Sequence, residues 1–222
     1  MSDRLMSVEE YQRLIGIGHL TPDDKVELIE NRIVCKATHI PQHAGTIGIV
    51  RDALNLVAFT DWGTRCRLTV VFSDSQTAPD ISVVRACPQH YMTRYPTATD
   101  TGLIIEIAPA ALIRDQRDKA RIYARGNIVC YWIVNLDDRR IEVHTQPSGP
   151  CDSPAYASVV DYAIGETVPL VLDGLLDAVA VGQVAPGRCS RPPRSSATCS
   201  ADRRVRALRR WGYSFRPSCS WP

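Results

Sequence analysis

The sequence predicts an α/β fold, in which a mixed β-sheet is flanked by helices. Three observations lead to this prediction. Short apolar stretches of strand composition occur at Leu103–Ala108 and at Ile128–Val134. Stretches in which apolar residues recur at helical spacing lie between the strands. The order along the chain is helix, hairpin, helix, strands, helix, strands, which is typical of a mixed sheet with helices packed on it.

The first predicted elements are a helix and a hairpin. Ser7 and Glu10 have the spacing of a capping box, which predicts that a short helix begins after Ser7. Lys25–Ile29 and Arg32–Cys35 then flank the pair Glu30-Asn31. This pair predicts a tight hairpin turn, because Asn tolerates the left-handed backbone conformation.

The next predicted elements are a long amphipathic helix and two strands. Apolar residues follow helical spacing from Gln42 to Phe59, which predicts a helix packed on the sheet. His43 falls in its first turn and is interpreted as a helix-start or packing residue. Cys66–Phe72 is predicted as a strand, joined through the polar residues 73–77 to a second strand at Ala78–Val84.

A charged helix is predicted after the strand Leu103–Ala108. Asp115, Lys119 and Tyr123 recur every four residues and therefore lie on one face of this helix, which ends at Gly126-Asn127. We expect Asp115 and Lys119 to point toward Glu106. The remaining predicted elements are the strand Ile128–Val134, a turn at Asn135–Arg139, the strand Arg140–His144, and a hairpin formed by Tyr156–Tyr162 and Thr167–Val171.

Charge is unevenly distributed along the chain. The 222 residues carry a net charge of +2, but residues 183–222 contain nine Arg and one Asp and contribute +8, which leaves −6 for residues 1–182. Residues 1–182 have the composition of one globular domain. From residue 183 on, Pro, Ser and Arg occur without periodicity. This pattern is typical of a basic, disordered tail or of a frameshifted end.

The composition argues against several classes of protein. No apolar run approaches the roughly 18 residues that a membrane span requires. The first residues lack the basic and apolar segments of a signal peptide, so we expect a cytoplasmic protein without a membrane partner. The eight cysteines contain no CxxC pair, which argues against a structural zinc site, and we expect them to remain thiols.

Acidic residues on the predicted strands point to a chemical function. Glu106 interrupts an apolar run, and a buried carboxylate requires a partner or a raised pKa. If the strand of Asp80 is its neighbour, two carboxylates about 5 Å apart repel each other by roughly 3 kcal/mol. Mg²⁺ or Mn²⁺ would relieve this repulsion, with Glu27 or a backbone carbonyl as a further ligand. A nearby lysine, Lys119, would then favour metal-dependent hydrolysis of a phosphodiester.

The residues that carry this argument occur together in a known family. The motifs are Glu27-Leu28-Ile29, His43, Pro79-Asp80, Glu106, Asp115 with Lys119 and Tyr123, and Tyr131-Trp132-Ile133-Val134. In their order and spacing, over about residues 5–180, they resemble the Uma2 family (domain of unknown function 820). This family comprises restriction-endonuclease-like proteins of the PD-(D/E)xK nuclease superfamily.

The resemblance implies a restriction-endonuclease-like core in residues 1–182, with Asp80 and Glu106 as metal ligands. It also implies that Glu27 is an additional acidic residue from the N-terminal hairpin, and that Lys119 acts as the lysine of the superfamily. That lysine normally lies two residues after the glutamate, where this chain has Ala108. Uma2-like sequences instead place a lysine in the following helix.

Two functions follow as alternatives. The first is an Mg²⁺-dependent DNA endonuclease with Asp80, Glu106, Lys119 and Glu27 as its catalytic residues, and with paired-site cutting that would favour a homodimer. Candidates for phosphate contacts on the charged helix are Arg114, Arg117 and Arg121. The second is a catalytically degenerate nucleic-acid-binding or protein-interaction module, with Glu106 in a structural ion pair. Its support is that Pro109-Ala110-Ala111-Leu112 replaces the Ser-Pro-Ser-Thr-like turn of the family.

Overall fold

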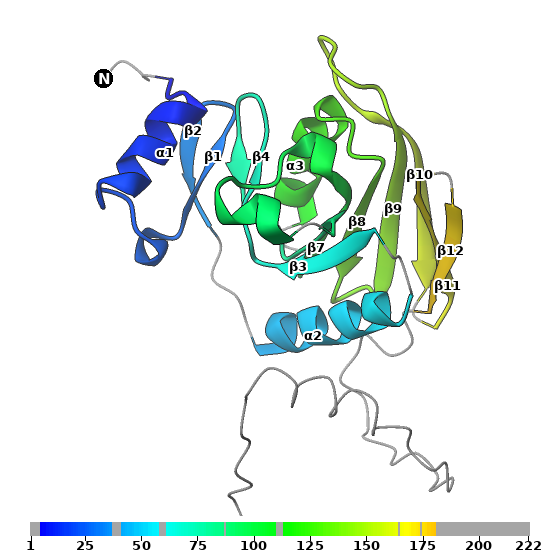
Figure 1. Cartoon of the computed structure of the whole chain (residues 1–222). Coiled ribbons are helices and arrows are strands. Elements are labelled where there is room, and N and C mark those ends of the chain that lie inside the picture. The colour runs from blue at the N-terminus through cyan, green and yellow to red at the C-terminus, as the bar shows by residue number, and fades with distance from the viewer. Residues whose placement is uncertain are drawn as a thin grey trace, which may run out of the picture. The chain divides into compact units, whose positions relative to one another are not determined.

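The computed structural model describes residues 5–36, 41–57, 61–86, 88–109, 113–163, 165–173 and 175–180, with the backbone alone at 88, 113–115, 175–178 and 180 (Figure 1). The predicted basic tail, residues 183–222, lies outside them. The helices are α1 (Val8–Gly16), α2 (Pro41–Leu56) and α3 (Ile113–Arg125), with 3-10 turns η1 (Pro22–Asp24), η2 (Pro88–Met92) and η3 (Ala98–Asp100). The strands are β1 (Val26–Ile29), β2 (Arg32–Cys35), β3 (Trp62–Cys66), β4 (Val70–Val71), β5 (Gln76–Thr77), β6 (Ile81–Arg85), β7 (Thr101–Ala108), β8 (Cys130–Asn135), β9 (Arg140–Pro147), β10 (Tyr156–Ala163), β11 (Thr167–Leu172) and β12 (Leu175–Ala180).

The described strands form three sheets. The largest is a mixed sheet in the order β10-β9-β8-β7-β6-β3, in which β7 and β8 are parallel and the other neighbours are antiparallel. A smaller antiparallel sheet has the order β2-β1-β5-β4, and β11 pairs with β12 alone. The predicted α/β fold with a mixed sheet and an N-terminal helix and hairpin is therefore confirmed.

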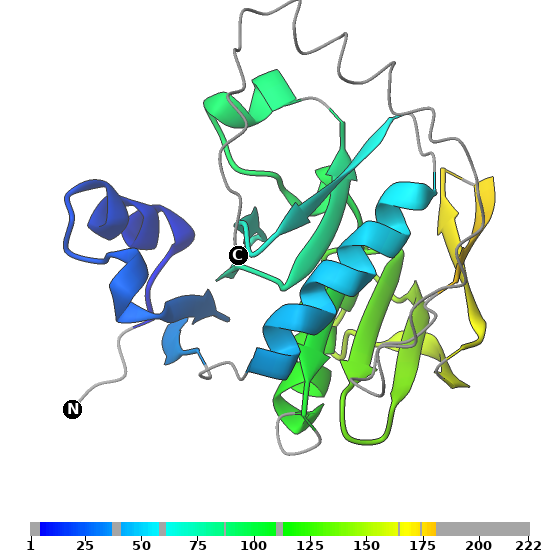
Figure 2. The ribbon, with the colours of Figure 1, turned by 90° about the horizontal axis from the view of Figure 1, so that it is seen from below.

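Strand β7 separates two layers of core, because its side chains alternate between the faces of the sheet. Leu103, Ile105 and Ile107 pack in the cluster that contains the apolar side chains of α2 and of β11. Ile104 and Ala108 pack in a second cluster with the apolar side chains of α3. Figure 2 shows α2 lying across one face of the large sheet. Glu106, between Ile105 and Ile107, therefore belongs to the face that α3 covers.

Several elements form where local sequence signals predict them. The Ser7 side chain accepts a hydrogen bond from the backbone N–H of Glu10, and the Glu10 carboxylate accepts one from the N–H of Ser7, both at 3.2 Å. The hairpin turn has φ values of 46° at Glu30 and 61° at Asn31, as a two-residue turn between twisted strands requires. Helix α3 ends before Asn127, whose φ of 57° allows the chain to leave the helix.

Three predictions about the strands were wrong. Cys66–Phe72 is not one strand, because Arg67 adopts a left-handed φ of 52° and separates β3 from β4. The link at residues 73–77, predicted without a strand, contains β5. Tyr156–Tyr162 does not form a hairpin with Thr167–Val171: β10 pairs with β9, and β11 pairs with β12, which was not predicted. Apolar side chains of β11 pack instead against the α2 face of the large sheet.

Candidate active site

Three acidic side chains from two sheets lie in the protein interior. Glu27 lies on β1, Asp80 directly precedes β6, and Glu106 lies in the middle of β7, and each is only 4% exposed. The antiparallel pairing of β6 with β7 sets Ile81 opposite Ile105. Asp80 therefore comes opposite Glu106, which confirms the expectation that their strands are neighbours.

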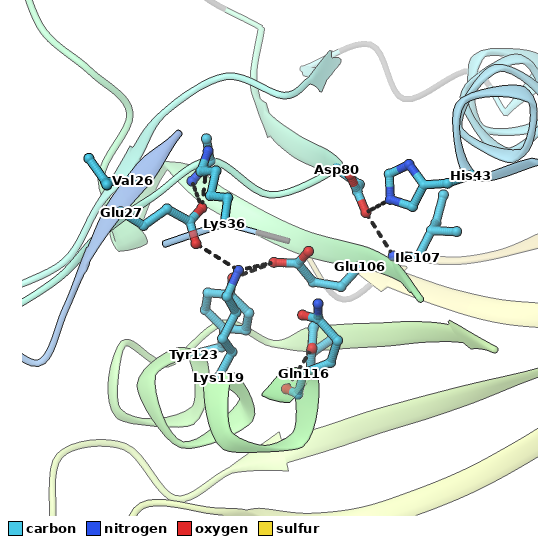
Figure 3. A network of polar contacts seen from close by, with 12 residues as sticks. Val26, Glu27, Lys36, His43, Asp80, Glu106, Ile107, Gln116, Lys119 and Tyr123 are labelled. Atoms are coloured by element: carbon cyan, nitrogen blue, oxygen red, sulfur yellow. Dashed lines mark hydrogen bonds and ion pairs between the residues drawn. The ribbon is translucent and has the colours of Figure 1, made fainter. Parts of the chain in front are cut away.

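Lys119 of α3 joins two of these carboxylates (Figure 3). Its Nζ lies 2.9 Å from Oε2 of Glu27 and 3.2 Å from Oε1 of Glu106. Tyr123, one helical turn later, donates its hydroxyl hydrogen to the same Oε1 of Glu106 over 2.9 Å. The four-residue spacing places both side chains on one helix face, as predicted. Glu27, Glu106 and Lys119 thus converge although the smaller sheet, the larger sheet and a helix each supply one of them.

The charges of this cluster perturb one another strongly. Burial raises the pKa of Glu106 to about 7: Lys119 opposes this rise, while Asp80 and Glu27 add to it. Burial also acts to raise the pKa of Glu27, but Lys119, Lys36 and the backbone N–H of Ala78 together lower it. The pKa of Lys119 is raised, because the attraction of Glu106 and Glu27 outweighs the effect of burial. Three buried carboxylates therefore face one buried ammonium group.

Two further basic residues border the cluster, and the sequence analysis missed both. Lys36 Nζ lies 3.3 Å from Oε1 of Glu27, and the backbone N–H of Ala78 donates to that oxygen over 2.8 Å. A signal for Lys36 exists in the sequence. The two-residue turn fixes Glu27 opposite Val34, so Lys36 follows two residues later on the same face of the hairpin. Arg67 carries no comparable signal.

Asp80 has a separate set of partners on the α2 side of the site. Its Oδ2 lies 2.8 Å from Nε2 of His43 and accepts a hydrogen bond from the backbone N–H of Ile107 over 2.9 Å. The Arg67 guanidinium contacts both residues: Nη2 lies 3.1 Å from Nδ1 of His43, and Nε lies 3.9 Å from Oδ1 of Asp80. His43 thus lies in the first turn of α2, as the sequence predicted, and also connects Asp80 to Arg67.

The described residues contain no group of three or more His, Cys, Asp or Glu side chains suited to hold a metal ion. Mg²⁺, however, is commonly bound through one or two carboxylates, with water and substrate phosphate as the other ligands. Asp80 and Glu106 could supply those carboxylates. Burial is the main cause of the raised pKa of Glu106, and the negative charges of Asp80 and Glu27 add to it. A divalent cation beside Asp80 and Glu106 would relieve this repulsion between carboxylates. The donor set therefore fits Mg²⁺ or Mn²⁺.

Two of the predicted phosphate-contact residues of α3, Arg117 and Arg121, are paired with carboxylates. Arg117 forms two hydrogen bonds with Glu142, of 3.2 and 2.6 Å, and Arg121 forms two with Glu30, of 3.0 and 2.6 Å. Their side chains are 60% and 51% exposed, so both stay accessible to solvent. The side chains of Arg114 and Asp115 lie outside the described residues.

A cavity of about 340 Å³ adjoins the cluster on the side of the N-terminal hairpin. Glu27, Lys36 and Arg67 line it, so it reaches both halves of the site. The other lining residues are Tyr11, Ile15, Leu20, Thr21, Pro22, Lys25, Val26, Thr69, Gln76, Thr77, Ala78 and Tyr95. The arrangement therefore combines buried carboxylates, a buried ammonium group and a solvent-accessible space with basic side chains on its wall.

Comparisons with known proteins identify the family. The sequence matches Uma2, described as "Putative restriction endonuclease", over residues 8–177. A crystal structure of "a putative nuclease belonging to DUF820" from Anabaena variabilis superposes with a TM-score of 0.55 at 18% sequence identity, covering 75% of this chain and 89% of that chain. At this identity the likeness establishes the fold alone. The comparison with curated proteins gives no match. Because the family match spans well over half of the sequence, the chain belongs to the Uma2 family.

Proposed function

We propose that this protein is a metal-dependent DNA endonuclease that hydrolyses phosphodiester bonds. One observation carries the proposal: Asp80, directly before β6, lies opposite Glu106 of the neighbouring strand β7, and Lys119 reaches Glu106 from α3. Buried carboxylates beside one amine are the groups that metal-assisted phosphoryl chemistry requires. Membership in a family described as "Putative restriction endonuclease" supports the same activity.

Each residue has a distinct role in this proposal. Asp80 and Glu106 hold Mg²⁺ or Mn²⁺, which when bound supplies Lewis-acid polarisation of the phosphate and a water of lowered pKa. Lys119 keeps its positive charge because its pKa is raised, so it stabilises the negative charge that develops on the phosphate. Glu27 holds the ammonium group of Lys119 in place through a 2.9 Å ion pair.

The proposed substrate is DNA. The backbone would approach along the cavity wall, where Lys36 and Arg67 offer positive charge beside the carboxylates. Arg114, Arg117 and Arg121 remain candidates for phosphate contacts that position the duplex. Arg117 and Arg121 would share their guanidinium groups between the phosphate and their present carboxylate partners.

The test is nicking of supercoiled plasmid by the purified full chain with Mg²⁺ or Mn²⁺. We expect metal-dependent nicking that is lost in Asp80→Asn and in Glu106→Gln. Glu142→Gln is the matched control, because Glu142 is also 4% exposed and also pairs with a basic residue, but it lies outside the cluster. Nicking that is retained in both site variants would reject the proposal.

A second candidate is a catalytically degenerate module that binds nucleic acid or protein. The contacts of Lys119 favour it: the ammonium group already bridges two carboxylates, as in a purely structural ion pair. Titration calorimetry with Mn²⁺ separates the two candidates, because a degenerate module should give no binding isotherm. A clear isotherm that disappears in Asp80→Asn would count against it.

The remaining parts of the proposal concern the organisation of the chain. We propose that residues 1–182 form the nuclease domain and that residues 183–222, with nine Arg, add only non-specific affinity for DNA. Among the described residues, no helix is long and apolar enough to cross a membrane. A cytoplasmic location and a homodimer stay predictions, which fractionation and light scattering can test.

A further inference from the structure

We propose that Arg67 and His43 form a positioning pair that leaves a single oxygen of Asp80, Oδ1, available to the metal ion. This inference rests on the proposed function and deepens it. It assigns no metal ligand beyond Asp80 and Glu106. It states which atom of Asp80 binds the cation and which two residues hold that atom in place.

The contacts of His43 determine which of its ring nitrogens carries the hydrogen. A guanidinium group has hydrogen-bond donors and no acceptor. Because Nη2 of Arg67 lies 3.1 Å from Nδ1 of His43, Nδ1 must be the acceptor. The hydrogen then lies on Nε2, which donates to Oδ2 of Asp80 over 2.8 Å. Arg67 thus fixes the tautomer of His43, and this tautomer fixes the direction of the hydrogen bond to Asp80.

The two oxygens of Asp80 consequently differ. Oδ2 accepts hydrogen bonds from His43 and from the backbone N–H of Ile107, which occupy its lone pairs. Within the described part of the chain, no hydrogen bond reaches Oδ1, and Nε of Arg67 lies 3.9 Å from it. A carboxylate held by outer partners in this way presents one oxygen to a cation without rotating. His43 is 2% exposed, so its ring has little freedom to turn away.

The backbone of Arg67 is anchored to the residue that its side chain serves. Its N–H lies 3.1 Å from the carbonyl oxygens of both Pro79 and Asp80. Its φ of 52° lies in the left-handed region, which for a residue with a Cβ costs about 1 kcal/mol or more. Glycine would avoid this strain, and its absence is consistent with a need for the guanidinium group. The same turn separates β3 from β4. The left-handed conformation of Arg67 therefore both breaks the predicted strand and places the guanidinium group beside Asp80.

Metal affinity tests the role of His43 without reference to catalysis. Mn²⁺ is titrated calorimetrically into the full chain, its His43→Ala and His43→Gln variants, and His144→Gln as a control in a second buried histidine, 7% exposed. We expect His43→Ala to weaken Mn²⁺ binding by about 10- to 100-fold. His43→Gln should recover most of the affinity, because its amide can donate from the position of Nε2. His144→Gln should bind like the unmodified chain.

The outcomes separate this inference from the proposed function. If the unmodified chain does not bind Mn²⁺, both fail. If it binds Mn²⁺ and the folded His43→Ala variant binds equally well, only the inference fails. Equal weakening in His43→Ala and His43→Gln would also overturn it, since the donated hydrogen bond would then not be the cause.

The tautomer itself is measured by long-range ¹H–¹⁵N NMR of the ¹⁵N-histidine-labelled full chain at mildly alkaline pH, with His43→Gln identifying the signal. We expect the Nε2–H tautomer both without and with Mg²⁺. Arg67→Ala should yield a mixture of tautomers. An Nδ1–H tautomer, loss of the Nε2 hydrogen on adding Mg²⁺, or an unchanged tautomer in Arg67→Ala would each overturn the proposed pair.

Discussion

Glu106→Gln is the substitution that most directly tests the electrostatics of the site. Gln has nearly the same shape as Glu and keeps a side-chain oxygen for the hydroxyl of Tyr123, but it cannot ionise. In the unmodified protein, burial and the nearby Asp80 and Glu27 raise the pKa of Glu106 from 4.5 to about 7, and Lys119 offsets only part of this rise. The ionised carboxyl group is therefore less favourable in the folded protein than in the unfolded chain.

The sign and the size of the effect follow from this difference. Because the folded state holds the proton of Glu106 more tightly, the free energy of unfolding falls as the pH rises from 4.5 to about 7. Such a shift corresponds to about 3 kcal/mol. We expect Glu106→Gln to gain about 3 kcal/mol of stability relative to the unmodified protein between about pH 5 and about pH 8. Below pH 4.5 the two proteins should depend on pH alike.

The assay is urea unfolding, monitored by circular dichroism at about pH 5 and about pH 8, with and without Mg²⁺. A cation bound at the proposed site would compete with the proton of Glu106, so Mg²⁺ should stabilise the unmodified protein more at the higher pH. At ten times the dissociation constant this gain is about 1.4 kcal/mol. It should be absent in Glu106→Gln and present in Glu142→Gln. A stability difference between Glu106→Gln and the unmodified protein that does not vary with pH would refute the reasoning.

Three other predictions follow. Lys119→Met leaves two buried carboxylates without their shared ammonium group, so chemical unfolding at neutral pH should show a loss of about 3 to 5 kcal/mol; an unchanged midpoint would contradict the assigned ion pairs. Gly102→Ala would bring a Cβ within 2.4 Å of Leu172 and 2.9 Å of Trp62, so calorimetry should show a loss of about 1 to 3 kcal/mol in the free energy of unfolding. An unchanged stability would contradict the packing of β11 at this position. Truncation to residues 1–182 should preserve the melting temperature. It should also make DNA binding less dependent on salt, because the nine Arg of residues 183–222 are removed. A lower melting temperature would place part of the domain beyond residue 182.

The elements that the sequence predicted correctly are those in which a few neighbouring residues determine the backbone. The capping box at Ser7, the turn at Glu30-Asn31 and the end of α3 at Asn127 each depend on local hydrogen bonds or on a left-handed residue. The four-residue spacing of Lys119 and Tyr123 likewise fixes one helix face, whatever surrounds it. These signals sufficed for the fold class and for the side of the sheet to which Glu106 points.

The wrong predictions concern choices among partners that are distant in sequence. An arginine in the left-handed conformation has no local signature, so the break at Arg67 was invisible. For β10 and β11, the expectation that consecutive strands pair gave the wrong hairpin. In the structure, β10 extends the large sheet beside β9, while Val168, Leu170 and Leu172 of β11 are buried in the core on the α2 side. Burial of apolar side chains, rather than sequence proximity, selected the pairing.

The same division explains why the acidic residues of the candidate site and Lys119 were predicted, while the contacts of Lys36, Arg67 and His43 were not. A carboxylate inside an apolar run is conspicuous in any sequence, because it must be desolvated. The basic side chains that pair with such a carboxylate have no distinguishing pattern in the sequence, because only the fold brings them near it. Arg67 and His43, for example, are 24 residues apart and meet only through the turn beside Asp80. For this chain, sequence reasoning found the carboxylates that needed partners and one of those partners, Lys119, and the structure was required to identify the others.

Helix α3 joins the N-terminal hairpin to the large sheet through two kinds of ion pair. The pairs of Arg121 and Arg125 with Glu30 are partly exposed, so each should contribute about 1 kcal/mol or less and weaken with salt. The contact of Lys119 with Glu27 is more deeply buried, with side-chain exposures of 17% and 5%, and its loss would be far more destabilising. The ammonium group that we propose to act in catalysis is thus also the one that holds Glu27, and with it the hairpin, against the helix. An enzyme that uses Lys119 to contact phosphate must weaken this attachment during turnover, so activity and stability oppose each other at that residue.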